Sequence, residues 1–431
     1  LTALEVARIP IGAFGGGGGA IAVVGSHILF VTPQGRLGYL RETAAGSGYE
    51  LRHIDAVVPM NRAGLQDSAF ARDPQFNASY FRTFGMLPVR RGDGRLGLYV
   101  SHHRYVGGCI QFVVSRATLT EAPDAIALDA SGWEDVFVAE PCIGVKATGH
   151  PFAGHQAGGR LARTAENTVL VTVGDHEFDG FNDPARVSMD ARTHLGKAVE
   201  INLDTRAVSV FATGLRNPQG LLISADGLVW ETEHGPHGGD ELNILQRGGN
   251  YGWPEVSYGV NYGFPSRPWP ANPAQGRHDG YARPVFSFMP SIGISNLIEI
   301  DGDEFPMWRG DLLVASLKDT ALRRLRRDAG HIVYSERILL GERLRDIRTL
   351  PDGQLVILTD AANLIVLRRK AEQGSEAVHR EPALTVSGYG SFGEVFAAEA
   401  PSAGSHGTGA EAGREVFNAR CAGCHASESG P

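Results

Sequence analysis

The amino-acid sequence predicts an all-β protein, a six-bladed β-propeller whose blades are four-stranded antiparallel sheets. Three observations support this fold class. Glycine is unusually common, at 56 of 431 residues, and follows no collagen-like period, which indicates many tight turns between short strands. Long amphipathic helical patterns are scarce. Short apolar, β-rich runs that follow a turn recur along the chain, and we count six of them.

The six apolar runs fit strands that are buried on both faces. They are Ile28–Thr32, Leu96–Ser101, Val169–Gly174, Leu228–Glu233, Leu312–Ser316 and Leu355–Asp360. Glycine turns such as Asp93-Gly94, Asp226-Gly227 and Asp352-Gly353 precede several of them. The repeating units are about 60 residues long, which suits four-stranded blades with long loops. Because the repeat is irregular, a pair of large β-sandwiches stays open as the alternative.

The C-terminal end carries the sequence Cys421-Ala422-Gly423-Cys424-His425. In such a motif the two thiols add to the vinyl groups of haem, and the adjacent histidine becomes an axial iron ligand. A zinc site would need further ligands nearby, and the sequence offers none there. We therefore predict haem c attachment at Cys421 and Cys424, with His425 on the iron, and a role in electron transfer outside the cytoplasm.

The amino-acid composition changes after Arg369. Residues 370–412 are rich in Ala, Gly, Ser and Glu, although Leu384–Phe396 can form a strand that closes the last blade. We expect a propeller over residues 1–396 and a flexible linker over residues 397–412. Residues 413–431 then read as the N-terminal fragment of a cytochrome c domain, and we expect the natural protein to continue beyond it.

Composition and charge exclude several classes of partner. The formal net charge is −8 and no basic tract stands out, which argues against nucleic acid. No run of about 18 apolar residues appears, so no transmembrane segment is predicted. The chain starts at Leu1, which is consistent with a removed signal peptide and a periplasmic or secreted protein. Cys109 and Cys142 can then form a disulfide, although two buried thiols remain an equal alternative.

Several motifs in the middle of the chain occur in a fixed order. They are Gly158–Leu161, Val173–Asp175, His194–Lys197, Gly214–Gly220, Trp230–Glu241, Gly249–Pro254, Ser316–Lys318, Arg343–Asp346 and Pro351–Gly353. Together they resemble the glucose/sorbosone dehydrogenase family, the soluble quinoproteins that use pyrroloquinoline quinone (PQQ). The resemblance extends roughly from Leu51 to Leu367 and is strongest after Gly154.

The resemblance implies that this chain binds PQQ, which carries three carboxylates and an ortho-quinone. Arginine suits carboxylates because its planar guanidinium makes bidentate contacts. The implied cofactor-binding residues are Arg62, Gln156, Arg216, Asn217, Lys318, Arg343 and Arg345. The alternation of Arg343 and Arg345 places both side chains on one face of a strand, which favours a shared role over two solvated surface charges.

By the same resemblance, the backbone carbonyls of Gly235 and Pro236 hold a Ca²⁺ ion beside the quinone; a plain tight turn is the simpler alternative. In the family a histidine removes the proton of the anomeric hydroxyl while hydride passes to the quinone. An aspartate, here Asp175, supports that histidine. Arg216 then stabilises the negative charge that develops on the quinone oxygen.

The sequence departs from the family at the position of the catalytic base. The family histidine lies four residues before the arginine of the Gly-Gly-Arg-Leu motif, and that position is Gln156 here. His155 lies one residue earlier and is our candidate base, provided that a bulge or loop absorbs the shift. If it does not, the site holds a glutamine, which is no general base at neutral pH. Arg62 likewise stands near a position where the family has glutamine.

These observations favour a periplasmic or secreted, PQQ- and calcium-dependent dehydrogenase. We expect it to oxidise an aldose or a related alcohol and to pass electrons to its tethered haem or to a respiratory acceptor. Two other functions stay open. One is a non-catalytic propeller that binds a partner, which the displaced His155 favours. The other is a calcium-dependent hydrolase of the lactonase type, against which the retained arginine and lysine residues argue.

Overall fold

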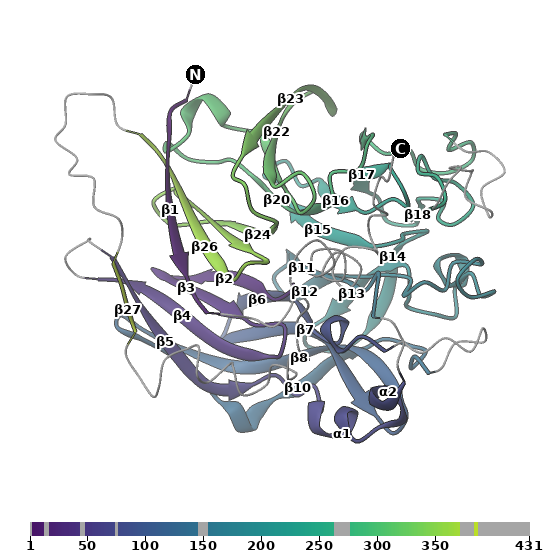
Figure 1. Ribbon diagram of the computed structural model, residues 1–431, viewed down its shortest axis with the longest axis horizontal. Coiled ribbons are helices and arrows are strands. Elements are labelled where there is room, and N and C mark those ends of the chain that lie inside the picture. The colour runs from purple at the N-terminus through teal and green to yellow at the C-terminus, as the bar shows by residue number, and fades with distance from the viewer. Residues whose placement is uncertain are drawn as a thin grey trace, which may run out of the picture.

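The computed structural model describes residues 2–12, 17–43, 48–73, 76–144, 154–262 and 276–370, and the backbone of residues 383–386. Six sheets surround a common axis, and Figure 1 views the ring nearly along it. The predicted six-bladed β-propeller is therefore confirmed. Each of the six apolar runs supplies the second strand of a different blade, so these local signals located every blade correctly.

Blades I to III follow one another along the chain. Blade I contains β2 (Ala20–Val24), β3 (His27–Val31), β4 (Arg36–Glu42) and β5 (Gly48–Val57). Blade II contains β6 (Thr83–Arg90), β7 (Leu96–Val106), β8 (Cys109–Ala122) and β10 (Glu134–Val138), with β9 (Ala125–Leu128) paired to β8. Blade III contains β11 (Gly158–Ala165), β12 (Thr168–Val173), β13 (Lys197–Asn202) and β14 (Val208–Thr213), with β18 (Gly249–Asn250) parallel to β14.

Blades IV to VI complete the ring. Blade IV contains β15 (Pro218–Ile223), β16 (Val229–Glu233), β17 (Asp240–Leu245) and β19 (Phe286–Phe288). Blade V contains β20 (Ile294–Glu299), β21 (Leu312–Ser316), β22 (Ala321–Asp328) and β23 (His331–Leu339). Blade VI contains β24 (Leu344–Thr349), β25 (Leu355–Thr359), β26 (Asn363–Arg369) and β1 (Leu4–Pro10).

The ring is closed by the N-terminal strand. β1 pairs antiparallel with β26 along its whole length, so the two ends of the propeller sequence share blade VI. We had expected Leu384–Phe396 to close the last blade. Instead β27 (Ala383–Val386) pairs parallel with β5 at the outer edge of blade I, because β1 already occupies the free edge of β26. Residues 387–431, with the predicted linker and haem motif, lie outside the described part of the chain.

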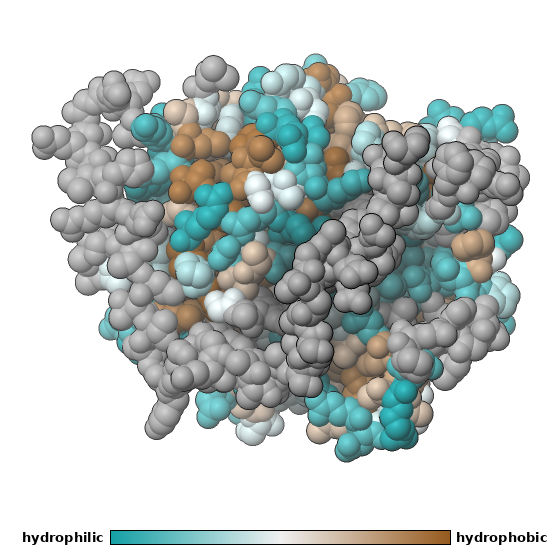
Figure 2. Space-filling model, in the orientation of Figure 1, coloured by the Kyte–Doolittle hydropathy of each residue, from teal (hydrophilic) through white to brown (hydrophobic). Residues whose placement is uncertain are grey.

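The hydrophobic core lies between the blades. The innermost strands β2, β6, β11, β15, β20 and β24 contact one another in a closed ring. Second strands such as β3, β21 and β25 are buried at every residue, because neighbouring blades cover both of their faces. On the face drawn in Figure 2, hydrophilic residues lie near the middle of the ring and hydrophobic ones nearer the outer strands of blades V and VI.

In the described part of the chain, the helices are short. The α-helices α1 (Arg62–Gln66) and α2 (Ala69–Arg72) connect blades I and II and lie at the rim of the ring in Figure 1. Within the described residues, no helix has the length and hydropathy needed to cross a membrane.

The strand directions gather many chain segments at one end of the propeller. In each blade the first two strands are antiparallel, so the residues before the first strand and after the second lie at the same end. Backbone bonds connect these segments between blades. The Asp175 N–H of blade III donates to the Arg216 carbonyl that precedes blade IV, at 2.9 Å. The segments at this end form the candidate site.

A disulfide joins Cys109 at the start of β8 to Cys142 beyond β10, with the Cα atoms 5.8 Å apart. The structure thus decides between the two alternatives that the sequence left open. Replacing both cysteines with serine is expected to lower the free energy of unfolding by about 3–4 kcal/mol, since the bond closes a loop with a sequence separation of 33 residues. Urea denaturation measures this loss. An unchanged midpoint would show that the unfolded chain gains no freedom from removing the bond.

Candidate active site

Arg216 lies at the centre of the site, between the end of β14 and the start of β15. Its backbone N–H donates to Glu233 Oε2 at 2.6 Å, and this bond fixes where the segment enters the blade. Its Nη1 donates to the carbonyls of His234 at 3.1 Å and Gly235 at 2.8 Å. The guanidinium also lies 5.2 Å from the ring centroid of Trp253. These contacts hold a buried cation in one orientation.

Asp175 follows the end of β12 and is fully buried. Its carboxylate accepts from the indole Nε1 of Trp253 at 2.6 Å and from the backbone N–H of Glu177 at 2.9 Å. Burial, and then the nearby Asp179 carboxylate, raises the pKa of Asp175 to about 8, although Arg216 and the two hydrogen bonds act in the opposite direction. Asp175 and Arg216 therefore share Trp253 as a wall of the site.

Gln156 fills the space between Asp175 and Arg216. In the amide orientation that satisfies both partners, its nitrogen donates to Asp175 Oδ1 at 2.7 Å and its oxygen accepts from Arg216 Nη2 at 3.1 Å. Gln156 adopts a left-handed backbone conformation with φ of 54°, just before β11 begins. The position at which the resemblance places the catalytic histidine thus carries an amide that binds both neighbours.

His155 lies beside Gln156 but has different partners. Its ring centroid is 3.9 Å from that of Tyr80, and its Nδ1 is 3.2 Å from Glu177 Oε1. The close approach of Tyr80 depends on Gly154, because a Cβ there would lie 2.4 Å from the Tyr80 Cβ. Among the described residues, the side chain of Asp175 is bonded to Gln156, Glu177 and Trp253 rather than to His155. The structure therefore brings His155 to a carboxylate, but to Glu177.

Arg343 and Arg345 converge on one carboxylate that our sequence reasoning missed. Arg343 Nε lies 3.0 Å from Asp360 Oδ2, and Arg345 makes bonds of 2.8 and 2.9 Å to the two oxygens of Asp360. The predicted common face of the two arginines agrees with this shared partner. Asp360 follows β25 as Asp175 follows β12, and that position after a second strand is the signal that could have revealed it.

The Arg216 and Arg345 side chains belong to the same electrostatic environment. Burial lowers the pKa of the His234 imidazole, and the positive charges of both Arg216 and Arg345 lower it further, whereas the negative charge of Asp240 raises it. His234 Nε2 also contacts the Ile294 carbonyl at 2.5 Å, which ties blade IV to the start of blade V. The cations from blades IV and VI therefore act on one imidazole at one end of the ring.

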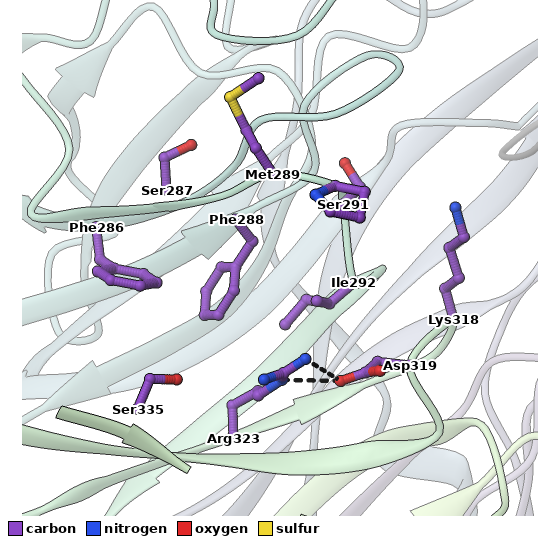
Figure 3. A pocket seen from close by; sticks show the side chains of 11 residues that line it. Phe286, Ser287, Phe288, Met289, Ser291, Ile292, Lys318, Asp319, Arg323 and Ser335 are labelled. Carbon is purple, nitrogen blue, oxygen red and sulfur yellow. Dashed lines mark hydrogen bonds and ion pairs between the residues drawn. The ribbon is translucent and has the colours of Figure 1, made fainter. Parts of the chain in front are cut away.

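Lys318 follows β21 and lines a cavity of about 390 Å³ in blades IV and V. Its backbone N–H donates to the Ile292 carbonyl at 2.9 Å, next to the segment that contacts His234. Figure 3 shows the Lys318 side chain extending away from the neighbouring Asp319–Arg323 ion pair. None of the other predicted cofactor-binding residues lines this cavity.

Asn217 and Gln219 add two amides to the site. They alternate at the start of β15, and Gln219 Nε2 donates to Asn217 Oδ1 at 2.8 Å. Asn217 Nδ2 also lies 3.3 Å from His234 Nδ1. We predicted Asn217 but missed Gln219, although a spacing of two residues on a strand places both on one face.

Arg62 contacts the segment that leads into blade II. It begins α1, donates to the Phe81 carbonyl at 3.1 Å, and its guanidinium lies 5.8 Å from the centroid of the Phe81 ring. Phe81 in turn stacks on His103, which contacts His176 next to Asp175. Arg62 therefore lies at the edge of the site, where α1 follows blade I.

The Gly235 carbonyl, one of the two predicted calcium ligands, lies against Arg216. The Gly235 carbonyl accepts from Arg216, and the Gly235 N–H donates to Asp240 Oδ1 at 3.2 Å. No group of three or more His, Cys, Asp or Glu side chains among the described residues is arranged to hold a metal ion. Because Ca²⁺ takes six to eight oxygen ligands, the Gly235 and Pro236 carbonyls fit it only together with further oxygens, such as those of an anionic cofactor.

The ion pairs of Asp360 predict a pH dependence. Burial alone would raise the Asp360 pKa, but Arg345 and then Arg343 outweigh it and lower the pKa to about 2. A pKa lowered by folding stabilises the protein above the unfolded value near 4, and the stabilisation is lost as the pH falls toward 2. Asp360→Asn should therefore destabilise the protein by about 2 kcal/mol at neutral pH and by much less near pH 2. Urea denaturation across this pH range measures the loss of stability, with the exposed Asp303→Asn as the control. Stability curves of wild type and Asp360→Asn that run parallel with pH would contradict the prediction.

Fold and site together define a class, the six-bladed propellers that gather cations, amides and carboxylates at one end of the ring. The chain belongs to the glucose/sorbosone dehydrogenase family, which it matches over residues 20–368. An aldose sugar dehydrogenase of Escherichia coli, YliI, is 33% identical over 357 residues, covering 78% of this chain and 85% of that protein. An uncharacterized protein of Synechocystis is 37% identical over 238 residues, covering 50% of this chain and only 56% of that protein.

Solved structures show the same architecture. A crystal structure of a glucose dehydrogenase superposes with a TM-score of 0.66 at 25% identity, covering 85% of this chain and 99% of that one. The PQQ-bound form of an aldose sugar dehydrogenase from Streptomyces coelicolor superposes with a TM-score of 0.55 at 16% identity, covering 86% and 99%. The second likeness shows the fold alone.

Proposed function

We propose that this protein is a PQQ- and calcium-dependent dehydrogenase that oxidises an aldose or a related alcohol outside the cytoplasm. One observation carries the proposal: Arg216, Arg343 and Arg345 lie at one end of a propeller of the glucose/sorbosone dehydrogenase family. The name of the Escherichia coli relative, an aldose sugar dehydrogenase, supports an aldose as the substrate.

The donor set suits a tricarboxylate quinone. Arg343, Arg345 and Lys318 supply cations for its carboxylates, and the amides of Asn217 and Gln219 supply hydrogen bonds. Asp360 neutralises one of the two arginine charges, so the group retains a net positive charge. When bound, PQQ supplies the hydride acceptor of the reaction. The residues of this chain orient it and exclude water from the buried side of the site.

Arg216 has the position needed to stabilise charge on the reacting side. Its guanidinium is held by two carbonyls and by Trp253, so it needs no rearrangement when negative charge develops nearby. Calcium fits the Gly235 and Pro236 carbonyls once an anionic cofactor completes its ligands. The negative charge of that cofactor would offset the repulsion between the calcium ion and Arg216. His155 is the candidate base for the hydroxyl proton of the substrate.

We further propose a periplasmic or secreted location and a c-type haem as electron acceptor. The Cys109–Cys142 disulfide supports an oxidising compartment. The motif of Cys421, Cys424 and His425 supports the haem. A tethered acceptor would reach an effective concentration on the order of millimolar at the reduced cofactor.

The proposal is tested by adding PQQ and Ca²⁺ to the purified protein and following the quinone absorbance as aldoses are added. We expect tight cofactor binding and an aldose-dependent loss of the oxidised quinone band. Failure to bind PQQ would refute the proposal and favour the non-catalytic propeller, for which Gln156 at the family's histidine position is the specific observation. Hydrolysis of a lactone without PQQ would instead indicate the calcium-dependent hydrolase.

A further inference from the structure

Asp175 and Arg216 both face a position just before β11. Gln156 occupies it and is bound at both ends of its amide, at 2.7 Å to Asp175 and 3.1 Å to Arg216. An amide does not accept a proton at neutral pH. Asp175 also accepts from Trp253 and from the Glu177 backbone. Gln156 is therefore not the proton acceptor of the reaction, and a neighbouring residue has to take that role.

His155 lies beside the Glu177 side chain. Its Nδ1 lies 3.2 Å from Glu177 Oε1, and an ionised carboxylate only accepts hydrogen bonds. A hydrogen bond across this contact requires the neutral imidazole to carry its proton on Nδ1, which leaves a lone pair on Nε2. His155 Nε2 is buried and has no hydrogen-bond partner within the described residues. The Tyr80 ring packs at 3.9 Å and limits rotation of the imidazole.

A left-handed stretch of backbone brings Glu177 to His155. His176 and Glu177 are both left-handed, with φ of 51° and 66°, and Gln156 is left-handed with φ of 54°. Non-glycine residues rarely adopt this conformation, and where they do, the surrounding structure holds them. Here the His176 N–H donates to the Gln156 carbonyl at 3.1 Å, and His176 Nε2 contacts His103 Nε2 at 3.1 Å. Two consecutive left-handed residues turn the chain so that Glu177 faces His155.

We propose that Glu177, rather than Asp175, is the positioning residue of His155, the candidate base. Asp175 instead orients Gln156 and, through it, Arg216. The inference rests on the proposed dehydrogenase function. The hydroxyl proton moves to Nε2 while the hydrogen on the same carbon leaves with its electron pair to the bound quinone. The substrate loses two electrons and two hydrogens, and the Glu177 carboxylate stabilises the imidazolium that forms.

The test uses Glu177→Met, which removes the acceptor and keeps an unbranched side chain at the left-handed position. Its matched control is Glu166→Met, in the exposed turn between β11 and β12. The ¹⁵N NMR signals of the His155 ring are recorded on the protein without cofactor, at alkaline pH where imidazoles are neutral, and assigned with His155→Asn. We expect the proton on Nδ1 in the wild type and in Glu166→Met, and a shift toward Nε2 in Glu177→Met.

The second measurement is steady-state turnover of the PQQ-loaded variants. Glu177→Met is expected to lower kcat by about tenfold or more with little change in KM, while Glu177→Asp recovers part of the loss. Wild-type protonation on Nε2, or an unchanged tautomer in Glu177→Met, would overturn the inference. A tautomer that responds to Asp175→Asn instead would assign the role to Asp175. Absence of PQQ binding in every variant would refute the proposed function and leave the tautomer result standing.

Discussion

Replacing Asp346 with alanine is expected to destabilise the propeller by about 3–5 kcal/mol, because the change leaves a buried arginine without its counter-charge. Asp346 lies on β24 and is fully buried. Its Oδ2 accepts from Arg160 Nη1 at 2.9 Å and from the Ile21 N–H at 3.0 Å. Its Oδ1 accepts from Asn296 Nδ2 at 2.7 Å. One carboxylate thus joins blades VI, III, I and V.

Arg160 extends the same network to a fifth blade. Its Nε donates to the Gln219 carbonyl of blade IV at 2.8 Å, and its Nη2 donates to the Arg345 carbonyl at 2.7 Å. Burial lowers the pKa of Arg160 to about 10, and Asp346 is the largest influence that opposes this shift. The ionised pair is stable in the interior because the protein satisfies its hydrogen bonds. The bond to Arg345 also connects the network to the candidate site.

Denaturation in guanidinium chloride, monitored by tryptophan fluorescence, measures this loss of stability. Asp303→Ala is the matched control, since Asp303 is almost fully exposed, with 95% of its side-chain surface accessible. Replacing both partners, as in Arg160→Met with Asp346→Leu, should cost less than the sum of the single changes, because no charge then stays buried alone. A loss below about 1 kcal/mol for Asp346→Ala would contradict the prediction, because an exposed ion pair contributes as much.

The sequence was sufficient for the blades because their signals are local. Each second strand is a short apolar run next to a turn, and burial between neighbouring blades explains its composition. The closing strand was not predicted, because nothing within Leu4–Pro10 identifies β26 as its partner; that pairing depends on the ring being complete. The Cys109–Cys142 bond likewise depends on a spatial distance that the sequence does not contain.

The site was predictable only in part, for a similar reason. Arg216, Arg343 and Arg345 were found through motifs, and topology brings them to one end. Their partners were not found. Asp360 pairs with two arginines across a hairpin, and Asp346 meets Arg160 from 186 positions away in the sequence. A one-residue shift decides whether histidine or glutamine faces Asp175, and only the left-handed backbone at Gln156 determines which one does.

Replacing Arg216 with methionine is expected to lower kcat of the PQQ-loaded enzyme by about 10²–10³-fold. The guanidinium is buried, held by the His234 and Gly235 carbonyls, and adjacent to the Gln156 amide. A donor fixed in this way stabilises developing negative charge without prior rearrangement, and methionine offers a similar length without charge or hydrogen bonds. Stopped-flow reduction of the bound quinone by saturating aldose measures the effect on the chemical step.

Two comparisons make the result for Arg216→Met specific. Arg95→Met is the matched control, because Arg95 is exposed on blade II and forms an ion pair with the neighbouring Asp93. It should leave the rate unchanged. PQQ affinity is measured separately by titration. Because Arg216 is one of several cations at the site, its loss should weaken PQQ binding less than it slows quinone reduction. If Arg216→Met binds PQQ normally and reduces it at the wild-type rate, the stabilising charge comes from another group, and Lys318 and Arg345 are then the cations to replace next.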